Sequence, residues 1–196
     1  MVINVLKEMA RPYLQEKYPD DALILEHAWD RRELYISRNC FGNGNDNSWD
    51  WYFEGESSVT VNSLEEICHW LSGCEYILDR DLFNQEDFWQ HPVTLEHTRK
   101  GDCEDQALWA WRKMALLGVK AEFVVGYLES DHENHLEGHA WLVYEHEGRK
   151  YIFEATGHGQ EEMILAFEEH YLEYIPEYSV DLDFKTYIFK QGLSNL

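Results

Sequence analysis

The sequence predicts an α+β fold, in which one buried helix packs on an antiparallel sheet. Residues 103–117 carry apolar side chains around most of a helical turn, which is typical of a helix at the centre of a domain. Three strand-like segments follow: 121–127 (AEFVVGY), 140–144 (AWLVY) and 151–153 (YIF). With 196 residues, of which 44% are hydrophobic and 15% aromatic, the chain is long and apolar enough to bury a substantial core.

The segments before the central helix predict less regular structure. Residues 2–17 form a candidate amphipathic helix that Pro12 interrupts. A helix is expected to begin after Ser63, a good N-cap, and to end at Gly73. The strand candidates here are the segments 33–37 (ELYIS), 49–54 (WDWYFE) and 58–61 (SVTV), the last two as a hairpin.

The remaining elements follow from helix and turn signals. Residues 81–101 predict two short helices, the second opened by Pro92. The segment EHEGRK predicts a hairpin turn between the last two strands of the sheet, and residues 161–174 and 186–189 predict a helix and a late strand. We expect residues 1–80 to form an α/β extension or cover of unknown role, and residues 81–196 to form the core. A single compact domain is the alternative.

The strong negative charge restricts the possible partners. The chain carries 38 acidic and 16 basic residues, a formal net charge of −22. A field of that sign repels nucleic-acid phosphates and an anionic membrane surface, so neither partner is expected. It would attract metal cations or a basic protein, although solubility alone is the simpler explanation of the charge.

Cysteine usage and the absence of targeting segments favour the cytoplasm. The first residues lack the basic and apolar regions of a secretory signal, and no stretch approaches the length of a spanning helix. Four irregularly spaced cysteines (Cys40, Cys68, Cys74 and Cys103) do not form a disulfide framework in a chain of this length. A reducing compartment is therefore expected.

Three separate segments each offer one member of a catalytic set: 101–105 (GDCED), 138–141 (GHAW) and 153–156 (FEAT). A free thiol ionises only near pH 8.5, and a helix N-terminus and a nearby imidazolium both favour the thiolate. Cys103 lies at the start of the predicted helix. His139 begins one strand of the predicted hairpin and Glu154 ends the other, close to register, so a carboxylate could orient the imidazole. The simpler alternatives are a buried structural thiol, a strand histidine and a surface carboxylate.

These motifs resemble the transglutaminase-like superfamily of cysteine enzymes. The resemblance lies in GDCEDQA, VVGY, GHAWLVYE and YIFEATG, and covers about residues 87–157. The stretch FWQHPVTLEHTRKGDCEDQALWAWRKMALLGVKAEFVV is similar to the bacterial transglutaminase-like cysteine proteinase branch. The resemblance implies a papain-like core with Cys103 as nucleophile, His139 as general base and Glu154 as orienting carboxylate. Most relatives have Asp at the third position, and Glu is one methylene longer.

An acyl-transfer reaction also needs hydrogen-bond donors for the developing oxyanion. The backbone N–H of Cys103 is one candidate by its position. By analogy with papain-like enzymes, the side chain of Gln90 or the indole of Trp89 is expected to supply a second.

No metal or other cofactor is expected, although two metal sites are possible alternatives. Asp102, Glu104 and Asp105 could bind calcium, as acids flanking the nucleophile do in some bacterial relatives, but complementing a helix N-terminus is the simpler role for them. A zinc site would use four irregularly spaced histidines: His132, His135, His139 and His158. A solvated acidic loop explains His132 and His135 more simply.

The leading functional prediction is an enzyme that acts on amide bonds of a protein or peptide through a thioester on Cys103. Proteolysis, deamidation and cross-linking share that first step, and hydrolysis is favoured because water is always present. One alternative is a non-catalytic binding module that presents its acidic surface to a basic partner. A metal-dependent protein built on the His-rich loop is another.

Overall fold

The computed structural model describes residue 29 and residues 32–35, 48–130 and 135–189. The helix expected at 2–17 lies outside the described residues, as do Cys40 and His132. The helices are η1 (Trp49–Phe53, 3₁₀), α3 (Leu64–Leu71), α4 (Asp79–Leu82), α5 (Pro92–Thr98), α6 (Cys103–Leu116), α7 (Gln160–Met163) and α8 (Phe167–His170). The strands are β1 (Arg32–Tyr35), β2 (Glu75–Tyr76), β3 (Lys100–Gly101), β4 (Ala121–Ser130), β5 (His135–His146), β6 (Arg149–Phe153), β7 (Ile164–Ala166), β8 (Tyr174–Val180) and β9 (Thr186–Phe189).

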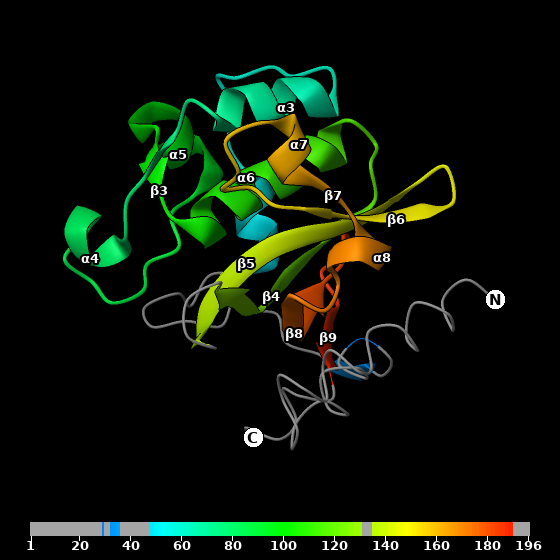
Figure 1. Ribbon diagram of the computed structural model, residues 1–196. Coiled ribbons are helices and arrows are strands. Elements are labelled where there is room, and N and C mark those ends of the chain that lie inside the picture. Colours follow the sequence, from blue (N-terminus) through cyan, green and yellow to red (C-terminus); the bar gives the residue numbers. More distant parts are fainter. Residues whose placement is uncertain (1–28, 30–31, 36–47, 131–134, 190–196) are drawn as a thin grey trace.

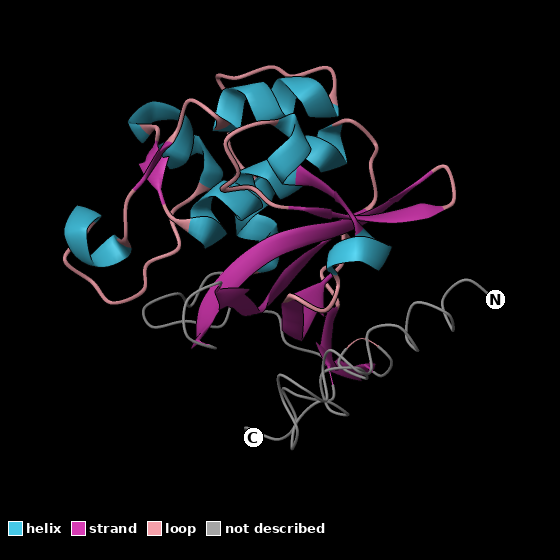
Figure 2. Cartoon of the chain, in the orientation of Figure 1, coloured by secondary structure: helices cyan, strands magenta, loops and turns pink. Residues whose placement is uncertain are grey.

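A seven-stranded antiparallel sheet forms the centre of the fold, in the order β1-β9-β8-β4-β5-β6-β7. The long hairpin of β4 and β5 pairs from Ala121↔Tyr144 to Ser130↔His135. A separate two-stranded parallel sheet joins β2 to β3. Figure 1 shows α3, α5 and α6 gathered on one side of the large sheet, and Figure 2 shows that most of the helical structure lies there. The predicted α+β architecture is confirmed.

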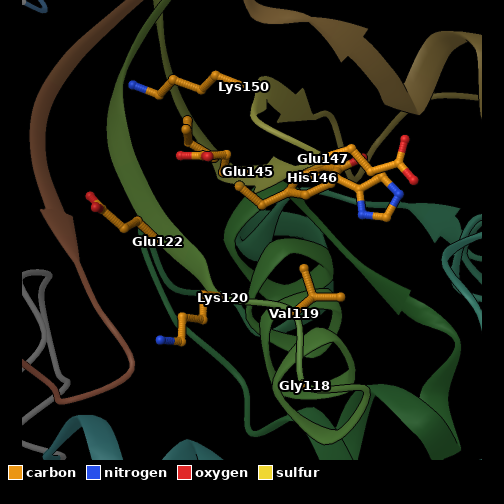
Figure 3. Close-up of a pocket in the computed structure, with 10 residues that line it drawn as sticks. Gly118, Val119, Lys120, Glu122, Glu145, His146, Glu147 and Lys150 are labelled. Atoms are coloured by element: carbon orange, nitrogen blue, oxygen red, sulfur yellow. The ribbon is translucent and has the colours of Figure 1, made fainter.

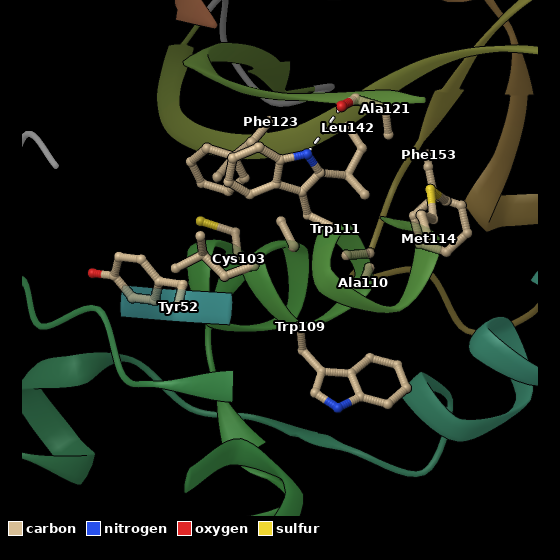
Figure 4. Packing of buried hydrophobic residues seen from close by; sticks show 14 of the residues in the cluster. Tyr52, Cys103, Trp109, Ala110, Trp111, Met114, Ala121, Phe123, Leu142 and Phe153 are labelled. Carbon is tan, nitrogen blue, oxygen red and sulfur yellow. Dashed lines mark hydrogen bonds between the residues drawn. The ribbon is translucent and has the colours of Figure 1, made fainter. Parts of the chain in front are cut away.

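The α6 helix is buried on both sides, as its wide apolar stripe predicts. Trp111 points from α6 toward the sheet residues Phe123 and Leu142 (Figure 4), and its indole N–H donates to the carbonyl oxygen of Ala121 at 2.9 Å. On the opposite side of the helix, Trp109 stacks on Trp70 of α3 with ring centroids 3.8 Å apart. Because side chains pack against both faces of α6, the surrounding core fixes the position of its first residue, Cys103.

Residues on both sides of position 80 share one hydrophobic core. Trp49 and Tyr52 of η1 and Ile67 of α3 belong to the same buried cluster as Trp111 and Phe123. A second cluster covers the other face of the sheet, around Val124, Trp141, Val143, Ile152 and Tyr174.

Several local predictions are confirmed. The hydroxyl of Ser63 caps α3 by accepting from the N–H of Glu66 at 3.2 Å, and Pro92 lies at the start of α5. The β5–β6 turn has positive φ at both Glu147 (51°) and Gly148 (73°), as a tight hairpin turn requires. The strand predicted at 186–189 is β9.

Two predictions before α5 are wrong. The segment predicted as a strand at 49–54 instead contains the helix η1 (Trp49–Phe53), in which Trp49 and Tyr52, three residues apart, are both buried. Residues 58–61 form no strand, because their backbone groups bond to side chains of other elements. The N–H of Ser58 donates to Glu96 at 2.7 Å, and the carbonyl of Val59 accepts from Lys113 at 2.5 Å.

The helix predicted at 161–174 is also wrong, because residues 164–166 pair with β6 as the edge strand β7. This pairing divides the segment into the short helices α7 and α8. Strand β8, which contains Pro176, was not expected. Within the described residues, no helix is both long and apolar enough to cross a membrane.

Candidate active site

Cys103 is the first residue of α6 and is only 8% exposed. It lies next to the part of strand β5 that extends beyond the end of its partner strand β6. The β5–β6 pairing ends at Leu142↔Phe153, so β5 continues for several residues beyond β6. In that stretch, the backbone amide of Ala140 favours the Cys103 thiolate and so acts to lower the pKa of Cys103. The thiol therefore lies beside the residue that follows His139.

His139 and Glu154 are joined directly. The distance from His139 Nε2 to Glu154 Oε2 is 2.7 Å, and the two side chains are only 9% and 11% exposed. Glu154 follows the last residue of β6, two positions from the residue that would face His139 in the ladder. The Glu side chain is long enough to span this diagonal offset and to contact the His139 ring.

Further hydrogen bonds hold the Glu154 carboxylate. Its Oε1 accepts from the N–H of Thr156 at 3.0 Å and from the Thr156 hydroxyl at 2.6 Å, and its Oε2 accepts from Tyr174 at 3.0 Å. Burial alone would raise the pKa of Glu154, but the bonds from His139 and Thr156 outweigh it and lower that pKa. An ionised carboxylate only accepts, so His139 Nε2 carries a hydrogen that it donates to Glu154.

One pocket contains both Cys103 and His139 and has a volume of about 390 Å³. The Cys103 thiol donates to Glu104 Oε2 at 3.2 Å in this structure, rather than to the His139 ring. The pocket lining is completed by Tyr76, Leu78, Asp79, Glu86, Asp87, Trp89, Asp102, Glu104, Val125, Gly126, Tyr127, Gly138, Ala140 and Glu177.

Buried carboxylates surround the nucleophile. Burial, and the charges of Glu104 and Asp102, raise the pKa of the Cys103 thiol well above its ordinary value. Burial and the charges of Asp102 and Asp105 likewise raise the pKa of Glu104 well above its ordinary value. The Cys103 thiol therefore keeps its proton at neutral pH.

Three of these carboxylates form a compact cluster: Asp79, Asp102 and Glu104 each offer an oxygen, and these oxygens all lie within 4.8 Å of one another. Asp79 Oδ1 and Asp102 Oδ1 are buried and have no hydrogen-bond partner among the described residues. Burial, together with the nearby charge of Asp102, raises the pKa of Asp79 to about 6. The cluster thus has the oxygen donors and the unsatisfied atoms that suit a hard cation.

Two of the three residues considered for the alternative calcium site belong to this cluster. The third, Asp105, instead faces Gln90, whose backbone N–H donates to Asp105 Oδ1 at 2.8 Å. Asp79 takes its place, held by its backbone N–H donating to Asp102 Oδ2 at 3.4 Å. Asp79 was not expected because no spacing in the sequence connects it to the nucleophile motif.

The structure places the two expected oxyanion donors differently. Gln90 is buried away from the pocket lining, and its side-chain amide donates to the carbonyl oxygen of Lys100 and to Asp105. Trp89 does line the pocket, but its indole N–H donates to Asp87 Oδ1 at 2.8 Å.

No histidine of the alternative zinc site belongs to the group of possible metal ligands found among the described residues. His139 bonds to Glu154, and His158 is exposed. Among the described residues, the group of three possible metal ligands contains only carboxylates.

A second pocket, of about 620 Å³, is lined by residues that follow α6 and by residues around the β5–β6 turn (Figure 3). Its lining mixes the cations Lys120 and Lys150 with the carboxylates Glu122, Glu145 and Glu147. It contains none of the candidate catalytic residues, so the pocket beside Cys103 is the candidate active site.

No family model matches the sequence, and no curated protein does. Among solved structures, the chain is similar to calcium-bound LapG of Legionella pneumophila, with a TM-score of 0.49, 22% identity, and coverage of 65% of this chain and 67% of that one. Another LapG structure gives a TM-score of 0.48 at 16% identity, over 98% of this chain and 90% of LapG. LapG treated with EGTA gives 0.44 at 16%, over 90% and 80%. The architecture of a central helix on an antiparallel sheet fits the transglutaminase-like superfamily that the sequence motifs resemble.

Proposed function

We propose that this chain is a cysteine-dependent enzyme that acts on amide bonds through a thioester on Cys103, with His139 as general base and Glu154 as the residue that orients it. The observation that carries the proposal is the buried 2.7 Å contact between His139 Nε2 and Glu154 Oε2, in a pocket that His139 and Cys103 both line. A histidine oriented by a carboxylate beside a thiol at a helix start is the arrangement that activates cysteine nucleophiles.

The direction of the hydrogen bond between His139 and Glu154 identifies the ring atom that takes part in proton transfer. Because Nε2–H donates to Glu154, His139 Nδ1 is the atom that takes the thiol proton. The thiolate forms a carbon–sulfur bond to the substrate carbonyl, and the carbonyl electron pair moves to its oxygen. When the tetrahedral intermediate collapses, the carbon–nitrogen bond breaks and His139 returns the proton to the leaving amine. Water or an amine then attacks the thioester carbon and gives its proton to His139. The carbon–sulfur bond breaks, which releases the acid or the new amide, and His139 returns the proton to the Cys103 sulfur.

We further propose that Asp79, Asp102 and Glu104 hold a divalent cation such as Ca²⁺. The support is the pair of unpartnered buried oxygens, on Asp79 and Asp102, in a set of three oxygen donors. A bound cation would supply positive charge where carboxylates now oppose the thiolate. Engaging Glu104 would also withdraw from the thiol the carboxyl group that now accepts its hydrogen.

The substrate we propose is a protein or peptide, with a basic protein as a candidate partner. The support is the net charge of −22 and the carboxylates Glu86, Asp87 and Glu177 that line the pocket. The same charge argues against nucleic acid and anionic membranes as partners. A cytoplasmic location is also proposed, because Cys68, Cys74 and Cys103 are free thiols.

Alkylation by iodoacetamide tests the proposed nucleophile. In the presence of Ca²⁺ at neutral pH, Cys103 should be labelled faster than Cys68 and Cys74, whose pKa values burial raises to about 11. The selective labelling should disappear in His139→Ala and persist in His146→Ala, a control on the same strand. Equal labelling of all thiols would contradict the enzyme proposal. An unreactive Cys103 in a protein that binds a basic partner would instead support the binding-module alternative.

A further inference from the structure

Tyr76 lies beside the nucleophile because of a short main-chain pairing. Strands β2 and β3 are parallel, with Tyr76 opposite Gly101, two residues before Cys103. The N–H of Ile77 donates to the carbonyl of Gly101 at 3.2 Å, and the N–H of Glu75 donates to that of Arg99 at 2.8 Å. These bonds fix the Tyr76 backbone relative to the start of α6.

The side chain of Tyr76 reaches the same pocket as the thiol. Tyr76 and Cys103 both line the cavity of about 390 Å³. Tyr76 is 49% exposed, and its hydroxyl makes no hydrogen bond to any described residue. A polar group at the mouth of the pocket, with its hydrogen uncommitted, can turn toward a bound substrate.

Neither side chain expected to donate a hydrogen bond to the oxyanion, Gln90 or Trp89, is free to do so in this structure. The amide of Gln90 is fully used behind the pocket, and the Trp89 indole N–H is directed at Asp87. The backbone N–H of Cys103, in the first turn of α6, has no acceptor within its own helix and supplies one donor. Nearby buried carboxylates make an oxyanion costly at this position, so a second donor has a large effect.

We propose that Tyr76 is an oxyanion donor: in the tetrahedral intermediate, its O–H donates to the former carbonyl oxygen, together with the backbone N–H of Cys103. This inference rests on the proposed thioester chemistry. The phenol keeps its proton throughout, since it only donates a hydrogen bond, and the proton transferred in the reaction moves between Cys103 and His139. Burial, and then the charges of Cys103 and Asp102, raise the pKa of Tyr76, which keeps the phenol in its donor form at neutral pH.

Two reagents separate this role from a general effect on the thiol. p-Nitrophenyl acetate acylates a thiol through a tetrahedral oxyanion, whereas iodoacetamide alkylates it by displacement and forms none. Both rates are measured for the full chain with Ca²⁺ present and corrected with Cys103→Ala. The variants are Tyr76→Phe and, as a matched control, Tyr127→Phe, which removes another pocket tyrosine hydroxyl that bonds to Glu177.

Tyr76→Phe should lower the acylation rate about 100-fold, the effect of losing one oxyanion donor, while alkylation stays within about twofold of the unmodified chain. Tyr127→Phe should change neither rate. An unchanged acylation rate in Tyr76→Phe, or an equal fall in both rates, would overturn the role given to Tyr76 while leaving the thioester proposal intact. If the unmodified chain reacts no faster than Cys103→Ala with either reagent, the thioester proposal fails and Tyr76 has no oxyanion to stabilise.

Discussion

Replacing Glu154 by Gln tests how the carboxylate controls the histidine. Glu154 accepts hydrogen bonds at both oxygens: Thr156 donates to Oε1, and His139 and Tyr174 donate to Oε2. The Gln carbonyl oxygen can replace only one of them. If the Gln carbonyl oxygen keeps the two bonds from Thr156, the Gln amide N–H groups face His139 Nε2 and the Tyr174 hydroxyl, which both donated to the carboxylate.

The His139 ring then gains a hydrogen-bond partner only by moving its hydrogen from Nε2 to Nδ1, the atom that must take the thiol proton. The change therefore removes the base rather than weakening it. A carboxylate-to-amide change of this kind costs about 10⁴-fold in kcat, or about 5 kcal/mol at 1.36 kcal/mol for each tenfold change. The isosteric substitution should leave the fold intact.

The assay is the rate of acylation of Cys103 by p-nitrophenyl acetate with Ca²⁺ present, alongside thermal unfolding as a check on the fold. Glu162→Gln is the matched control, because Glu162 lies on the neighbouring helix α7 and bonds to the backbone of His158 at 2.8 Å. It should react like the unmodified chain. A Glu154→Gln rate within about threefold of that control would refute the orienting role.

Three further predictions concern stability and metal binding. Burial alone would raise the pKa of Glu96, but hydrogen bonds from Lys113, Ser57, Ser58 and Trp109 lower it to about 2 from an ordinary 4.5. Since the folded value is the lower one, the resulting stability of about 3 kcal/mol is present above pH 4.5 and is lost as the pH falls toward 2. Urea unfolding of Glu96→Gln should lack that pH dependence. Ca²⁺ should raise the unfolding temperature of the unmodified chain and of the control Asp81→Asn, but not that of Asp79→Asn. If calorimetry finds equal Ca²⁺ binding by both variants, the carboxylate cluster is not the site. Gly126→Ala places a Cβ 2.1 Å from a backbone carbonyl oxygen of β8 and should lower the free energy of unfolding in urea by about 1–3 kcal/mol. Gly138→Ala, in the same pocket but with open space at its Cβ, should have little effect. Equal effects of the two substitutions would contradict the close packing at Gly126.

The sequence predicts the parts of the site that depend on local patterns. The wide apolar stripe after Cys103 marks a buried helix, and the Glu-Gly turn sets the register that brings His139 and Glu154 within two positions of each other. Both signals extend over several residues, so helical and strand periods distinguish them.

The parts of the site that the sequence did not predict depend on strand pairings that are too short to give a periodic pattern of side chains. Strands β2 and β3 have two residues each, yet they bring Tyr76 beside the nucleophile, and the helix α4 that follows β2 begins with Asp79. Similarly, Gln90 is used by Asp105, a contact between two elements whose approach no local pattern predicts. The segment 164–166 shows the same effect in reverse, because edge pairing with β6 divides a segment whose residues favour a helix.

The formation of an acyl group on Cys103 can be measured directly. The chain is mixed with p-nitrophenyl acetate and Ca²⁺, quenched in acid and mapped by peptide mass spectrometry. The predicted result is a single acetyl group on the Cys103 sulfur, removed by hydroxylamine and absent from His139→Ala. Acetylation confined to lysine side chains, with Cys103 unmodified, would contradict the account.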